Sequence, residues 1–106
     1  TALCVAFGVC MLLVIASKPL FELGQVCLTS GTHALMLEGQ LDVNNLINRH
    51  VSGDWSDMCE EDRQTNQDAI THGDRIFSSF NLPTQKVWVI TEYDRSVTTI
   101  LLPDEY

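Results

Sequence analysis

Cations are scarce in this sequence. Its 106 residues include six Lys and Arg against fourteen Asp and Glu, which gives a formal net charge of −8 at pH 7. A protein that binds nucleic acid needs clustered Lys and Arg to replace the counterions of the phosphates. We therefore expect no direct nucleic-acid binding. The length suits one small domain and is too short for a cofactor domain plus a substrate domain.

The motifs that mark catalysis or metal binding are also missing. There is no Gly-x-Ser-x-Gly nucleophile turn and no Gly-rich phosphate loop ending in Gly-Lys. His33, His50 and His72 are spread along the chain without an H-E-x-x-H pattern. The cysteines at positions 4, 10, 27 and 59 form neither a Cys-x-x-Cys pair nor a zinc spacing with a histidine. We therefore expect a protein that is not an enzyme, with no cofactor and no bound metal.

Residues 1–17 carry no charge, and the run from Ala2 to Ala16 has no polar side chain. A membrane-spanning helix needs about 20 apolar residues, and a signal peptide needs Lys or Arg ahead of its apolar core. Three interpretations stay open: upstream sequence translated ahead of Met11, a signal or membrane anchor, or a part of the fold. Contact with a membrane is expected only if residues 1–17 are native. Residues 18–106 are expected to form a single small domain.

Three helices are predicted in the first part of that domain. The first covers 33–38. The second begins after Asp42, a typical N-cap, carries apolar residues at helical spacing and ends at Gly53. The third begins with Asp57 and Glu60, which form a capping pair, and is polar almost throughout.

Strands are predicted mainly in the second part. A short strand at 26–28 precedes the helices, and β-branched and aromatic residues predict strands at 76–80, 87–91 and 97–102. The tight connection at 93–96 should make the last two a hairpin. The prediction is therefore an α+β domain, with two or three N-terminal helices followed by an antiparallel three-stranded meander.

One strand leaves its orientation open. In 87–91, Trp88 and Ile90 alternate with Val87 and Val89, so both faces are apolar. Either face could pack on the helices.

The segment GDWSDMCEED is the strongest candidate for a binding surface. It places Trp55 among five carboxylates: Asp54, Asp57, Glu60, Glu61 and Asp62. Three interpretations of these acids stay open: they complement the positive end of a helix, they face a partner with Trp55 as the apolar anchor, or they hold a divalent ion, although the EF-hand pattern is missing. Trp55 could instead be a core residue between two helices.

The hairpin tip is a second candidate. It contains Glu92, Asp94 and Arg95. A turn commonly collects such residues, and Arg95 could pair locally with either acid at little energetic consequence.

Three stretches resemble a family of small acidic bacterial proteins that are encoded on plasmids and integrative elements. They are KPLFELGQ at 18–25, RHVSGDW at 49–55 and RIFSSFNLPTQKVWVITEYDRSVTTILLPDEY at 75–106. The resemblance covers roughly residues 11–106 and implies a cytoplasmic protein of mobile DNA, with no activity to transfer. Some members are labelled type I restriction modification subunits. An amino-methyltransferase, however, needs an adenosylmethionine-binding fold and an [ND]-P-P-[YF] motif, and this chain has neither.

The leading hypothesis is a non-enzymatic accessory protein of a mobile element that binds a protein with a basic surface. The alternative is a DNA mimic that inhibits a restriction, modification or other defence complex, although its acids are clustered rather than spaced like phosphates. The candidate partner-binding residues are Asp54, Trp55, Asp57, Glu60, Glu61, Glu92, Asp94 and Arg95.

Overall fold

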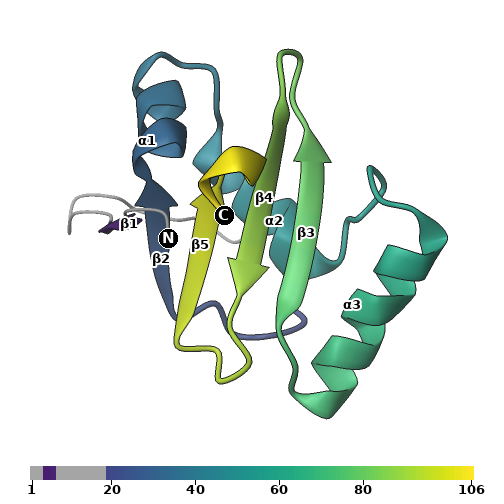
Figure 1. Ribbon diagram of the computed structural model, residues 1–106. Coiled ribbons are helices and arrows are strands. Elements are labelled where there is room, and N and C mark those ends of the chain that lie inside the picture. The colour runs from purple at the N-terminus through teal and green to yellow at the C-terminus, as the bar shows by residue number, and fades with distance from the viewer. Residues whose placement is uncertain (1–3, 7–18) are drawn as a thin grey trace.

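A computed structural model describes residues 4–6 and 19–106 (Figure 1). The elements are, in order, β1 (Cys4–Ala6), β2 (Gln25–Thr29), α1 (Ser30–Leu37), α2 (Val43–Ser52), α3 (Glu60–His72), β3 (Ile76–Asn81), β4 (Lys86–Thr91), β5 (Val97–Leu101) and the 3₁₀ turn η1 (Pro103–Glu105). Most of the apolar extension at 1–17 lies outside the described residues. Among those that are described, no helix is long and apolar enough to cross a membrane.

The strands form one mixed sheet in the order β1-β2-β5-β4-β3. β3, β4 and β5 pair in antiparallel fashion, but β2 pairs in parallel with β5, and β1 is antiparallel to β2. The α+β class is therefore confirmed. The prediction of a sheet of only three antiparallel strands, all after the helices, is wrong. The reason is that β2, which precedes the helices, has a nearly continuous apolar run and occupies an interior position beside β5.

α2 begins and ends as the sequence predicts. The Asp42 carboxylate accepts the Asn45 N–H at 3.1 Å. Gly53 ends the helix at φ 80°, a left-handed conformation that glycine adopts without a steric penalty. Local capping and apolar spacing agree here, so the boundaries could be predicted.

The other two helices differ from their predicted starts. α1 begins at Ser30, three residues before the predicted start at residue 33. α3 begins at Glu60 with Cys59 as its N-cap, so the prediction that Asp57 caps this helix is wrong. The physical reason is a long-range contact: the Asp57 carboxylate accepts the Asn81 N–H of β3 at 2.9 Å instead.

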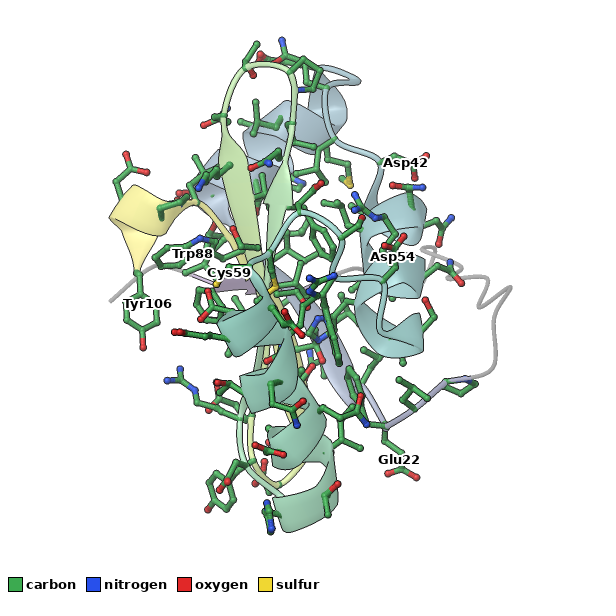
Figure 2. The ribbon with its side chains drawn as sticks, turned by 90° about the vertical axis from the view of Figure 1, so that its right-hand side faces the viewer. Glu22, Asp42, Asp54, Cys59, Trp88 and Tyr106 are labelled. Atoms are coloured by element: carbon green, nitrogen blue, oxygen red, sulfur yellow. The ribbon has the colours of Figure 1, made fainter. Side chains whose placement is uncertain are left out.

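The main core lies between the sheet and α2, which stands behind the sheet in Figure 1. Val87 and Val89 are fully buried in this core, which settles the open orientation of β4. Trp88 points to the opposite face, where its half-buried ring meets Phe77 at 4.8 Å and Tyr106 at 5.8 Å between centroids. Figure 2 shows Trp88 and Tyr106 on one side of the sheet and α2 on the other.

A smaller core joins α3 to the edge of the sheet. It contains Trp55, Met58, Ala69 and Ile76. α3 itself buries only Asn66 and Ala69. The polar sequence of this helix is thus explained by its position on the outside of the domain, beside β3 (Figure 1).

Candidate functional site

The acidic segment follows α2 directly and leads into α3, along the outer edge of β3. Arg49 of α2 holds its first part. The Arg49 Nε lies 3.1 Å from Asp54 Oδ2, and the Arg49 Nη2 lies 3.4 Å from Asp57 Oδ2. The guanidinium also stacks 4.5 Å from the centre of the Phe80 ring. Two of the five clustered acids are thus paired with a cation of their own chain.

These contacts change the pKa of the Asp54 carboxyl group. Partial burial raises its pKa, but the Ser56 hydroxyl and the charge of Arg49 oppose burial and outweigh it. The pKa therefore lies below its ordinary value. Asp54 stays ionised and forms an exposed ion pair, which contributes little to stability by itself.

Asp57 has a second structural contact in addition to Arg49. Its Oδ2 accepts the Asn81 N–H at the edge of β3. Two other side chains also bind the backbone of β3. The Met58 Sδ accepts the Ser79 N–H at 3.4 Å, and the Asn66 side chain binds the backbone of Phe77. This part of the acidic segment is built into the fold.

Trp55 lies in the core, which matches the alternative considered from the sequence. It is 5% exposed, and its indole Nε1–H donates to the Ser78 Oγ at 2.9 Å. The ring belongs to the same core cluster as Met58 and Ala69. A partner at the surface therefore meets almost none of the indole, and we remove Trp55 from the candidate binding surface.

The start of α3 presents the remaining acids. Glu60, Glu61 and Asp62 are exposed. Among residues 4–6 and 19–106, no side chain forms a hydrogen bond or an ion pair with any of their three carboxylates. Of the three, Glu60 lines a shallow, open depression on the surface. The other lining residues are Gly53, Trp55, Arg63, Gln64 and Gln67. Of the clustered acids, these three are the ones free to meet another molecule.

The hairpin tip is mostly occupied by its own contacts. Arg95, at φ 59°, donates to the backbone oxygens of Asp74 at 2.6 Å and Ala69 at 3.2 Å, which attaches the tip to the end of α3. The Ser96 hydroxyl and N–H bind the Asp94 carboxylate and lower its pKa. Glu92 pairs with Arg75 at 3.3 Å.

The two candidate surfaces do not merge. The tip contacts the carboxyl end of α3, whereas Glu60 and Glu61 stand at its amino end. α3 is thirteen residues long, so its two ends lie about 18 Å apart along the helix axis. A partner that contacts one surface therefore need not contact the other.

The histidine of α2 is the most notable residue that sequence reasoning did not single out. His50 is fully buried, with Nδ1 2.5 Å from Ser78 Oγ and Nε2 2.8 Å from Thr91 Oγ1, and Phe21 packs edge-on at 5.1 Å. Burial, and then the positive charge of Arg95, lower the pKa of His50 to about 3. Its place in the apolar stripe of α2 was the signal that could have indicated burial.

These groups form one continuous chain of hydrogen bonds. In order, it runs through Trp55, Ser78, His50, Thr91, Thr98 and the carbonyl of Leu23. The indole N–H can only donate and the carbonyl can only accept, so every hydroxyl must point the same way. The neutral His50 then accepts at Nδ1 and donates at Nε2. The network joins α2 to three strands and gives each of its own buried polar side chains a hydrogen-bond partner.

Among the residues that the structure describes, no group of three or more His, Cys, Asp or Glu could hold a metal ion. What the surface offers is carboxylate charge at the start of α3, on a support fixed by contacts to α2 and β3. Comparisons with family models, curated proteins and solved structures gave no match to this chain.

Proposed function

We propose that this protein is a non-enzymatic acidic accessory protein of a mobile genetic element, which acts in the cytoplasm by binding a basic surface of another protein. The observation that supports it best is the set of exposed, unpaired carboxylates of Glu60, Glu61 and Asp62. With a net charge of −8, the chain as a whole attracts a cationic partner.

The support beneath these carboxylates favours recognition. Asp57 is bonded to Arg49 and Asn81 immediately before the helix begins. The first turn of α3 is therefore held in place before a partner arrives, which lowers the entropy lost on binding. We propose Glu60 and Glu61 as the centre of the surface, with Asp54 and Asp57 at its margin. Glu92 and Asp94 form a second candidate surface at the hairpin tip.

The test begins with affinity capture from the host, followed by association kinetics with the retained protein. Charge reversal by Glu60→Lys and Glu61→Lys should slow association and weaken its dependence on salt, because exposed charges act mainly on the association rate. The matched control is Glu22→Lys with Glu38→Lys, which changes the net charge equally at exposed positions outside α3. Equal rates for the two double variants would refute the proposed surface.

The geometry gives less support to a DNA mimic. Successive residues of a helix point about 100° apart, so Glu60, Glu61 and Asp62 fan out around one turn. They do not follow a line, as the phosphates of one strand do. Capture of a nuclease or methyltransferase complex that DNA displaces would favour the mimic over the accessory protein.

A further inference from the structure

β3 is an outer strand of the sheet without protection of its own. Its sequence, IFSSFN, contains no charged residue, proline or glycine. Edge strands usually carry such residues to prevent pairing with another chain. A six-residue uncharged segment of this kind is also typical of strands that associate with copies of themselves. Protection must therefore come from another part of the molecule.

In an antiparallel pair, alternate residues direct their backbone groups away from the partner strand. On β3, the outward groups belong to Phe77, Ser79 and Asn81, because side chains outside the sheet bind all three. The Phe77 N–H donates to the Asn66 Oδ1 at 3.0 Å, and the Phe77 oxygen accepts from the Asn66 Nδ2 at 2.6 Å. The amide of Asn66 thus supplies the acceptor and the donor that a neighbouring strand would supply.

Two further side chains continue this line of contacts. The Met58 Sδ accepts the Ser79 N–H, and the Asp57 Oδ2 accepts the Asn81 N–H. Residues 57–66 therefore cover the outward N–H groups of β3 from Phe77 to Asn81. We call this segment the edge cover. Asn66 is 2% exposed although it is polar, which fits a residue whose hydrogen bonds are made inside the protein.

We propose that the edge cover prevents β3 from pairing with β3 of a second copy of this chain. The uncovered edge is self-complementary. An antiparallel pair of β3 strands centred on Ser79 sets Phe77 of each copy opposite Asn81 of the other, and the outward groups of both strands then bind each other. No like charges meet in this pairing, since β3 has none. The inference does not rest on the proposed function, because the side chains bonded to β3 are those of Asp57, Met58 and Asn66, and the centre of the proposed binding surface is Glu60 and Glu61.

The test removes the cover and measures the molecular mass by light scattering over a range of protein concentrations. Asp57→Ala with Asn66→Ala should convert a monomer into a concentration-dependent dimer. The matched control is Gln64→Ala with Asp68→Ala. It deletes a polar pair of the same helix, 3.1 Å apart, that faces solvent, and it should stay monomeric.

Two further results decide whether β3 is the surface that pairs. In the dimer, the amides of Phe77 and Asn81 should remain protected from hydrogen exchange. Adding Ser79→Pro to the double variant should restore the monomer, because proline removes the central outward N–H and is tolerated on an edge strand.

A double variant that stays monomeric, a dimer with unprotected edge amides, or a dimer that survives Ser79→Pro would each overturn the proposal. So would wild-type protein that is already dimeric. If the double variant loses its cooperative melting, Asp57→Ala alone takes its place, since it removes contacts of a partly exposed side chain. A weaker dimer is expected there, and a strict monomer would again overturn the proposal.

Discussion

The buried histidine predicts how the stability of the domain depends on pH. The pKa of His50 is lowered from 6.5 to about 3 in the folded protein, and unfolding returns it to the higher value. Between these two values the unfolded chain binds a proton that the folded protein excludes. The free energy of unfolding must therefore fall as the pH falls through this window.

The size of the effect follows from the two pKa values. Each unit of difference corresponds to about 1.4 kcal/mol, so lowering the pH from about 7 to about 5 should reduce the free energy of unfolding by about 2 kcal/mol. His50 is fully buried, so solvent screening does not weaken this effect. The lowered pKa values of Asp54 and Glu105 act in the same direction, but only at lower pH, where carboxylates titrate.

Urea unfolding at several pH values measures this dependence directly. The matched variant is His50→Gln, which cannot be protonated. It should be less stable at neutral pH, by about 1–3 kcal/mol, because one hydroxyl of the network loses its partner. Its free energy of unfolding should change little between about pH 7 and about pH 5. The reasoning fails if the wild-type stability is flat in this range, or if His50→Gln keeps the wild-type slope.

Three other predictions concern packing and backbone geometry. Trp88→Ala should cost about 2 kcal/mol in urea unfolding, less than a fully buried tryptophan, because the ring is half-buried against two aromatic rings. Gly24→Ala should destabilise far more than Gly39→Ala in thermal melts: both have φ above 60°, but only at Gly24 would a Cβ overlap backbone carbonyls. Gly31→Ala would place a Cβ 2.8 Å from Glu105 Oε1. Its cost should therefore shrink in a Glu105→Ala background, and an additive double-mutant cycle would contradict the contact.

The elements that could be predicted from the sequence are those specified by neighbouring residues. α2 has its N-cap, its apolar stripe and its terminal glycine within one short stretch. The strands at 76–81, 86–91 and 97–101 follow from β-branched and aromatic runs. The parallel pairing of β2 with β5 joins residues about 70 positions apart along the chain. No local pattern contains that pairing.

The candidate site, too, has parts that local sequence predicts and parts that depend on long-range contacts. The sequence indicated the acidic segment, and Glu60 and Glu61 are exposed as a binding surface requires. It could not show that Asp57 would bind Asn81, or that Trp55 would donate to Ser78, because both contacts depend on how β3 lies beside the segment. Tertiary contacts therefore determine which residues of the acidic segment stabilise the fold and which stay exposed to solvent.

The central claim is that the first part of the acidic segment is structural and completes the edge of the sheet. Native-state hydrogen exchange of the backbone amides of β3 tests it most directly. In the wild-type protein, the Phe77, Ser79 and Asn81 amides should all be protected although none of the described strands lies on that side of β3. At a protein concentration low enough to keep the variant monomeric, Asp57→Ala should expose the Asn81 amide selectively. Fast exchange of the Asn81 amide in the wild-type protein, or an unchanged rate in Asp57→Ala, would contradict the claim.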